Sequence, residues 1–218
     1  MNPTSVVRAL ALPVLFSISS LSHATLLVYN SQASFMSATT QQGVDTYSGF
    51  NIVGATPSPI IRNAGAYSYT ATASTSSFYG AGSTANPWLS TNQATDSIMF
   101  SNFSGGAQAI GGNFFGSDIS GLFASGSVLV TAVDLTGTSV QTITGATVSS
   151  FLGFVSTDTL ISLTVSSIQP ATGVLWPTVD NLTIARAVPT QADVPEPGSI
   201  TLLLGGLGLM GALARRPS

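Results

Sequence analysis

The sequence is short of charge and of several reactive residue types. Its 218 residues include no cysteine, no lysine, one histidine and one glutamate, and only 6% are charged, against about 25% in typical soluble proteins. Without cysteine, no disulfide can staple the fold, so an exported domain would depend on its own hydrophobic core. Without clusters of Lys and Arg, and with a net charge of −3, the chain cannot pair with a phosphate backbone, which excludes nucleic acid as a partner.

The same absences exclude most catalytic chemistry. A serine nucleophile needs a neighbouring histidine or lysine, and zinc sites of the common type need histidine or cysteine. The one histidine, His23, lies in a segment that we expect to be removed from the mature protein. Carboxylate chemistry remains, but no pair among the seven aspartates lies in a recognisable motif. We therefore predict a protein that is not an enzyme.

Hydroxyl groups replace the missing charges. The chain has 32 serines and 26 threonines, while 44% of its residues are hydrophobic. That hydrophobic content is too high for a disordered chain. The sequence therefore predicts a folded domain whose surface is hydrated mainly by hydroxyls.

The region 25–190 shows the period of two that is typical of β-strands. Ile161, Leu163 and Val165 alternate with Ser and Thr across 160–168, which predicts them on one face of a strand. Glycine and serine clusters separate this run from the other candidate strands at 25–29, 67–72, 97–103, 107–115, 127–135, 151–155 and 179–187. A short helix is expected at 31–40, with Ser31 as its N-cap. The sequence predicts an all-β fold, an antiparallel β-sandwich of jelly-roll type.

Residues 1–24 have the three parts of a secretory signal peptide. Arg8 supplies the positive start, an apolar run follows at 9–18, and small residues precede Ala24. This apolar run is too short to span a bilayer. We therefore predict cleavage between Ala24 and Thr25.

The C-terminal segment also has three parts. A Pro-rich linker at 191–197 holds the motif Val194, Pro195, Glu196, Pro197, where the prolines prevent helix. Residues 198–214 are uncharged and mostly apolar. As a helix they would extend about 25 Å, enough for a single transmembrane helix when flanking arginines snorkel. The alternative is the last core helix of a soluble domain. Arg215 and Arg216 open a basic tail at 215–218 and predict a cytoplasmic C-terminus.

This combination closely resembles the PEP-CTERM sorting signal of Gram-negative bacteria, a tail also called the ice-binding protein C-terminal domain. The resemblance implies recognition by an exosortase and sorting to the cell envelope, the cell surface or the exopolysaccharide matrix. Segments 112–118, 151–155 and 176–182 are also similar to β-sandwich ectodomains that often carry this tail. We therefore expect a surface or matrix protein with a structural or adhesive role; the alternative is a carbohydrate-binding module of the exopolysaccharide matrix.

A few residues of the central region are candidates for binding. Trp88 lies in a polar segment at 80–95 and is a candidate glycan contact, with core filling as the alternative. No cofactor is expected apart from a candidate calcium site through Asp118 or Asp180, which lie near turns and strand ends. A buried Asp180 could instead be satisfied by Arg62 or by local backbone N–H groups.

Sheet edges are the last feature that the composition addresses. Lysine is the residue that most often protects an exposed edge, and this chain has none. The edges are therefore expected to be short or covered by loops, or else to pair with a second copy or with a matrix component.

Overall fold

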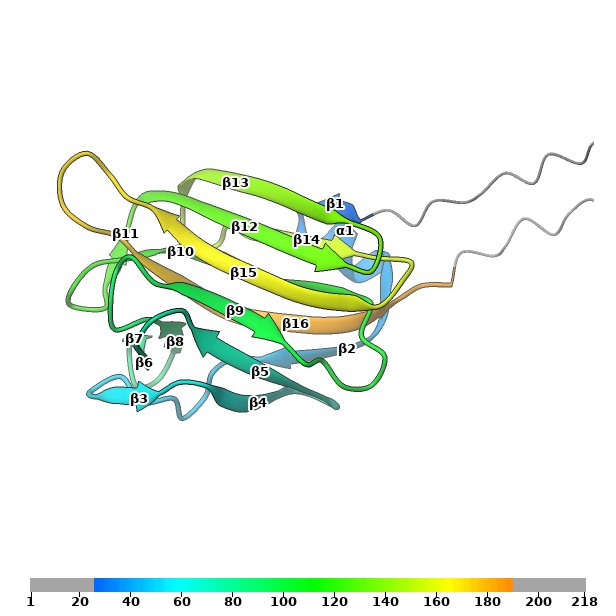
Figure 1. The fold of residues 1–218 in the computed structure, drawn as a ribbon, viewed down its shortest axis with the longest axis horizontal. Helices are drawn as coiled ribbons and strands as arrows, with labels where there is room; N and C mark the ends of the chain where they lie inside the picture. Colours follow the sequence, from blue (N-terminus) through cyan, green and yellow to red (C-terminus); the bar gives the residue numbers. More distant parts are fainter. Residues whose placement is uncertain (1–25, 190–218) are drawn as a thin grey trace, which may run out of the picture.

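Two antiparallel β-sheets make up residues 26–189, the part of the chain that the computed structural model describes (Figure 1). The larger sheet has the order β1 (Leu27–Tyr29), β14 (Phe151–Val155), β10 (Ala109–Ser117), β16 (Trp176–Ala187), β8 (Pro87–Ser90) and β7 (Ala81–Gly82), with β2 (Thr39–Asp45) also beside β16 and β11 (Phe123–Ala124) beside β10. The second sheet has the order β13 (Thr138–Ala146), β12 (Gly126–Asp134), β15 (Leu160–Ile168), β9 (Ser97–Ser101), β5 (Tyr67–Ala73) and β4 (Ile60–Ala64). A small ribbon pairs β3 (Ala55–Pro57) with β6 (Ser77–Tyr79).

The path of the chain between the sheets is that of a jelly roll. In chain order, the principal strands are β2, β9, β10, β12, β13, β14, β15 and β16. In the larger sheet, the neighbouring strands β2-β16-β10-β14 are the first, eighth, third and sixth of this series. In the second sheet, the neighbouring strands β9-β15-β12-β13 are the second, seventh, fourth and fifth. This alternation is the connectivity of two linked Greek keys. The predicted all-β antiparallel fold is confirmed, and β4 and β5 extend the second sheet beyond the eight strands.

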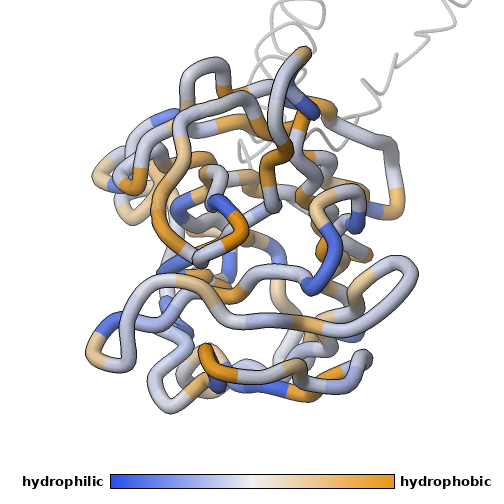
Figure 2. The backbone as a smooth tube through the Cα atoms, turned by 90° about the vertical axis from the view of Figure 1, so that its left-hand side faces the viewer, coloured by the Kyte–Doolittle hydropathy of each residue, from blue (hydrophilic) through white to orange (hydrophobic). Residues whose placement is uncertain are grey.

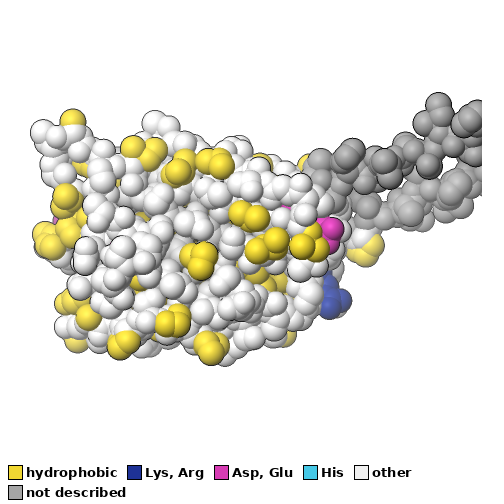
Figure 3. Space-filling model, in the orientation of Figure 1, with side chains coloured by type: hydrophobic (Ala, Val, Ile, Leu, Met, Phe, Trp, Pro, Cys, Tyr) yellow, Lys and Arg dark blue, Asp and Glu magenta, His cyan; other side chains and the backbone are white. Residues whose placement is uncertain are grey.

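The hydrophobic core lies between the two sheets. Alternate side chains of β12 and β15 point into it, including Val128, Val130, Leu163 and Val165, and they belong to the same buried cluster as Phe114 of the larger sheet. Outward positions are mainly Ser and Thr. As a result, the tube in Figure 2 is mostly pale, and the face drawn in Figure 3 is largely uncharged with separate apolar spots.

One predicted core residue of β15 points outward. Leu163 and Val165 are buried as expected, but Ile161 is 43% exposed and Leu160 is buried in its place. The cause is an irregular register, because Val133 pairs with Ser162 whereas Asp134 pairs with Leu160. A bulge of this kind exchanges the faces of the residues beyond it.

The helix expected at 31–40 is shorter than predicted. It is α1, Gln32–Ser37, and β2 begins at Thr39. Ser31 occupies the N-cap with an extended backbone, but its side chain makes no capping hydrogen bond. The buried ring of Phe35 fixes the helix on the outer face of the larger sheet, where a Cβ on Gly153 would lie 2.4 Å from that ring. Packing therefore holds this helix in place of side-chain capping.

Strand β16 is the longest element and runs from one end of the domain to the other (Figure 1). Its twelve residues span about 36 Å at about 3.3 Å per residue. A bulge at Asn181, which has φ 51°, breaks its alternation. Val179 and Leu182 therefore both point into the core, and Asp180 lies opposite Asn113.

Both ends of the described chain lie at the same end of the domain (Figure 1). The N–H of Val188 donates to the carbonyl of Ala38 at 3.0 Å. Leu27, Val188 and Pro189 line one cleft there, of about 390 Å³. The end at which β16 begins is therefore far from the point where the chain leaves the domain.

Several sequence predictions lie outside residues 26–189. These are the signal peptide at 1–24 with its cleavage between Ala24 and Thr25, the linker at 191–197 with its motif, the transmembrane helix at 198–214 and the basic tail at 215–218. Among the described residues, no helix has the length and apolar character needed to cross a membrane.

Candidate functional site

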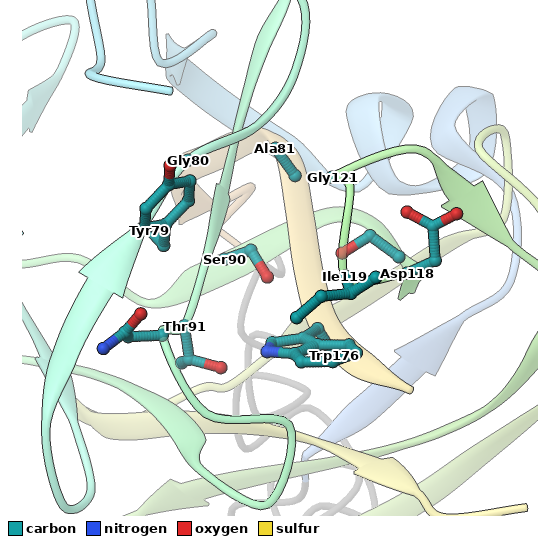
Figure 4. Close-up of a pocket in the computed structure, with 11 residues that line it drawn as sticks. Tyr79, Gly80, Ala81, Ser90, Thr91, Asp118, Ile119, Gly121 and Trp176 are labelled. Carbon is teal, nitrogen blue, oxygen red and sulfur yellow. The ribbon is translucent and has the colours of Figure 1, made fainter. Parts of the chain in front are cut away.

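A cleft of about 250 Å³ opens at the end of the domain where β16 begins (Figure 4). We call it the distal cleft. It is lined by Tyr79, Gly80, Ala81, Ser90, Thr91, Asn92, Ser117, Asp118, Ile119, Gly121 and Trp176. These residues come from β6, β7, β8, β10 and β16 and from the segments that follow β8 and β10. Jelly-roll connectivity therefore gathers four separate parts of the chain at this end.

One wall of the cleft is the segment around Tyr79. β6 ends at Tyr79, and a bridge between Phe78 and Thr91 ties this segment to the chain after β8. The N–H of Asn92 donates to the carbonyl of Ser77 at 2.9 Å, which secures the same connection. Tyr79 is 37% exposed, so its ring is available at the side of the cleft.

The opposite wall is the loop at 118–122, which is held by its own hydrogen bonds. Oδ1 of Asp118 accepts from the N–H groups of Ser120 at 2.8 Å and Leu122 at 3.0 Å. The carbonyl of Gly121 accepts from the N–H of Gly82 at 2.8 Å. Gly121 has φ 72°, and a Cβ there would lie 3.1 Å from Cα of Ala81, so glycine permits this close approach. The two walls are thus joined to each other.

Hydroxyl groups and one indole form the floor. Ser90 donates to the carbonyl of Pro177 at 2.9 Å, and Thr178 donates to Oγ of Ser117 at 2.8 Å. Trp176, 9% exposed, lies beside Ile119 across the cleft from Tyr79 (Figure 4). Ser90 therefore keeps acceptor capacity, whereas Ser117 accepts from Thr178 and keeps its own proton to donate.

Three polar groups around the cleft are left open. The hydroxyl of Tyr79 and the side-chain amide of Asn92 make no hydrogen bond to other described residues, and none of these residues donates to Oδ2 of Asp118. The cleft therefore combines two aromatic rings with an open hydroxyl, an open amide and an open carboxylate oxygen.

Trp88, the predicted glycan contact, lies outside this cleft and in a strand rather than a loop. It belongs to β8, is half-buried, and meets the ring of Phe115 edge-on at a centroid distance of 4.9 Å. A Cβ at Gly82 would lie 2.9 Å from the indole, so the backbone of Gly82 covers part of that ring. Nε1 of Trp88 is buried without a hydrogen-bond partner.

Asp180 is buried within strand β16, and its carboxylate accepts hydrogen bonds from the neighbouring residue. Its Oδ1 accepts from the N–H of Asn181 at 2.8 Å, and its Oδ2 accepts from the Asn181 side chain at 3.1 Å. Of the two partners expected for a buried Asp180, the local backbone is the one observed, and Arg62 pairs with Asp45. Burial raises the pKa of Asp180, and hydrogen bonds from Asn181 and Asn86 only partly offset this.

The two aspartates proposed for calcium are not brought together. Asp118 follows the end of β10, whereas Asp180 pairs with Asn113. Five strand residues separate these positions, or about 16 Å, and a calcium ion contacts its ligands at about 2.3–2.6 Å. Residues 26–189 contain no group of three or more His, Cys, Asp or Glu side chains that could hold a metal.

The sequence did not single out Tyr79, Asn92 or Trp176 as one site. Tyr79 and Trp176 are nearly a hundred residues apart in the chain, so only the fold shows that they face one cleft. The local signal was the Gly-Ser-Asp turn before residue 119, which did point to Asp118.

Comparison with known proteins identifies the C-terminal segment. A family model, the PEP-CTERM protein-sorting motif, matches residues 193–216. The chain carries a PEP-CTERM sorting motif. The motif indicates an exported protein that an exosortase recognises and that is associated with the cell envelope. Neither the curated proteins nor the solved structures include a significant match to this chain.

In the sequence the PEP-CTERM motif follows the last residue of β16, whereas the distal cleft lies where that strand begins. The motif starts at residue 193, shortly after β16 ends at Ala187, and Trp176 at the other end of the strand lines the cleft. The cleft therefore opens at the end of the domain opposite the one that leads to the motif.

Proposed function

We propose that this chain is an exported, non-enzymatic protein of the cell surface or extracellular matrix with a structural or adhesive role. The sorting motif at residues 193–216 carries the proposal, because it accounts for export and for recognition by an exosortase. The surface supports it, since the face in Figure 3 is nearly free of charge. Such a surface can meet neutral polymers through hydrogen bonds and apolar spots.

The residue content of the domain supports a non-enzymatic role. Residues 26–189 contain no His, Cys, Lys or Glu. Asp45 is committed to an ion pair, and the carboxylates of Asp96 and Asp134 accept hydrogen bonds from neighbouring hydroxyls. These three aspartates therefore act as structural acceptors, and residues 26–189 hold no histidine or lysine that could serve a serine as its general base.

Processing in a host that has an exosortase is the direct test. We would fractionate cells that express the full chain and determine both termini by mass spectrometry, beside a Glu196→Ala variant. The wild type is expected in the envelope or outside the cell with Thr25 as its first residue. The variant is expected to remain in the inner membrane. Unprocessed wild type in the cytosol, or identical sorting of both chains, would contradict the proposal.

A second candidate function is that of a carbohydrate-binding module. The observation that favours it is the distal cleft, where the rings of Tyr79 and Trp176 stand among hydroxyl and amide groups. A glycan array with the purified protein tests this function as a whole. A Trp88→Ala variant on the same array tests whether the contact predicted from the sequence contributes.

Calcium is the one cofactor that we propose, with Asp118 as its carboxylate ligand. Asp118 lies in a turn at the cleft and keeps Oδ2 open, whereas Asp180 is 7% exposed. Backbone carbonyls and water would complete the coordination. Calorimetric titration with calcium, with Asp118→Asn as the control, is expected to show binding in the wild type alone. No heat and no change in melting temperature would exclude it.

A further inference from the structure

We propose that the distal cleft binds an uncharged saccharide unit, with Tyr79 and Trp176 as its apolar contacts and Asn92 and Asp118 as its polar contacts. The inference rests on the second candidate function above and adds a location and a class of ligand to it. The cleft volume of about 250 Å³ lies just below the ~300–1,000 Å³ of clefts for drug-sized ligands. One or two sugar rings suit a space of this size.

The lining matches the two kinds of surface that a sugar ring presents. A pyranose has apolar C–H faces and a rim of hydroxyls. Tyr79 and Trp176 stand on opposite sides of the cleft (Figure 4), and aromatic rings contribute a large apolar area with a polar tip. The Asn92 amide offers both donors and an acceptor, and the open carboxylate oxygen of Asp118 accepts only. Hydroxyls that donate and accept at once can satisfy both groups.

The charged side chains in and near the cleft determine which class of saccharide it favours. Arg62 and Arg186 are the only cationic side chains in residues 26–189, and neither lines the cleft. Arg62 is paired with Asp45, and the guanidinium of Arg186 donates to the carbonyl of Gly105. Asp118 instead places a negative group at the rim. Without a bound calcium ion, a phosphate, a sulfate or a uronate would meet repulsion that no cationic side chain of the cleft compensates, so the metal-free site favours neutral sugars.

The two tryptophans of the chain permit a site-specific measurement. Trp88 and Trp176 are the only ones, so in a Trp88→Phe variant the emission comes from Trp176 alone. We would purify the full chain in a zwitterionic amine-oxide detergent, since maltoside detergents carry a neutral sugar themselves. The probes are neutral hexasaccharides of glucose and of mannose, each sugar in a β-1,4-linked and an α-linked form. A hexauronate is the charged comparison. Calorimetry on the wild type runs in parallel.

At least one neutral hexasaccharide is expected to change the Trp176 emission in a saturable manner, and the hexauronate is not. Tyr79→Ala and Asn92→Ala are each expected to weaken binding about tenfold, the effect of losing one contact worth about 1–2 kcal/mol. Ile161→Ala is the matched control, because Ile161 is 43% exposed on the other sheet. Melting temperatures of all variants establish that they are folded.

Two results would overturn the proposal. One is a wild type that binds none of the neutral hexasaccharides, or that binds the hexauronate more tightly. The other is binding that Tyr79→Ala and Asn92→Ala leave unchanged while Trp88→Phe abolishes it in calorimetry. That second result moves the site to Trp88 and retains the carbohydrate-binding function, so the two failures are distinguishable. Export of the protein is tested separately and is unaffected by either result.

Discussion

Arg62 and Asp45 form a two-pronged ion pair that joins the two sheets at one side of the domain. Nε of Arg62 lies 2.7 Å from Oδ2 of Asp45, and Nη2 lies 2.8 Å from Oδ1. Asp45 ends β2 of the larger sheet, and Arg62 lies in β4 of the second. Asp45 also accepts from the hydroxyl of Tyr69 at 2.7 Å and the N–H of Tyr47 at 2.8 Å. Four donors therefore hold one buried carboxylate.

Removing this arginine should leave an unpaired buried carboxylate. We expect Arg62→Met to lower the free energy of unfolding by about 3 kcal/mol, the lower end of the range for breaking a buried pair, because the Arg62 side chain is 21% exposed. Urea unfolding followed by circular dichroism measures it. Arg186→Met is the control, because Arg186 is exposed and bonds only a carbonyl, and a loss as large in that variant would contradict the explanation.

Two aspartates should give stability opposite dependences on pH. Burial alone would raise the pKa of Asp96, but hydrogen bonds from Ser76, Thr75 and Ser74 outweigh it and lower that pKa below 3.8. Its contribution is present above pH 3.8 and is lost as the pH falls through the folded-state pKa. Burial raises the pKa of Asp180, so its contribution is full below pH 3.8 and is lost as the pH rises through the folded-state pKa.

The corresponding variants should separate these effects. Asp180→Asn is expected to stabilise the protein at pH 7 and to change little at pH 3. Asp96→Asn is expected to destabilise it at pH 7 and to change less below pH 3. Denaturant unfolding at both pH values measures this. Parallel behaviour of the two variants would show that the opposite pKa shifts do not govern stability.

Gly43 allows two backbones to meet between the sheets. A Cβ on Gly43 would lie 2.1 Å from the carbonyl oxygen of Ala64 and 3.0 Å from Cα of Gly65. Since neither neighbour is a movable side chain, Gly43→Ala is expected to cost about 1–3 kcal/mol, the usual cost of overpacking. Gly137→Ala is the matched control, because nothing lies within 4 Å of the place that its new methyl group would take. Thermal melting compares the two, and equal melting temperatures would refute the steric argument.

The edge strand β13 is the element that we expect to pair with a second copy. It is nine residues long, forms one border of its sheet and carries no charged side chain, a combination that natural edges usually avoid. We expect the apparent mass in size-exclusion chromatography to rise with protein concentration. Thr142→Lys should suppress this rise, whereas Ile161→Lys on the central strand β15 should not. A wild type that stays monomeric at all concentrations would refute the expectation.

Strands with strong apolar alternation could be predicted from the sequence. The segments 151–155 and 160–168 coincide with β14 and β15. Apolar and hydroxyl residues alternate in 160–168, whereas 151–155 is a short apolar run between turn residues. β13 was missed because Ser139 and Gln141 occupy inward positions and only Ile143 and Ala146 contribute apolar side chains to the core. β2 was missed because Gln41, Gln42 and Gly43 show no alternation. Its pairing comes from β16, a hundred and forty residues later.

The candidate site was less predictable than the fold. Asp118 could be found because the Gly-Ser-Asp turn is a local signal. The apolar contacts of the cleft could not, because nothing in the local sequence distinguishes Tyr79 or Trp176 from a core aromatic. Trp88 illustrates the difficulty, since it lies in a mainly polar segment at 80–95 and yet packs against Phe115.

The length of β16 also has a mechanical consequence. This strand is bonded to β10 along one side and to β2 and β8 along the other. Its last residue leads toward the sorting motif, and its first residue, Trp176, lines the distal cleft. Tension between an anchored tail and a polymer held at Trp176 would run along one unbroken strand. The load would act on two ladders in shear, so many hydrogen bonds would resist it together instead of opening one after another.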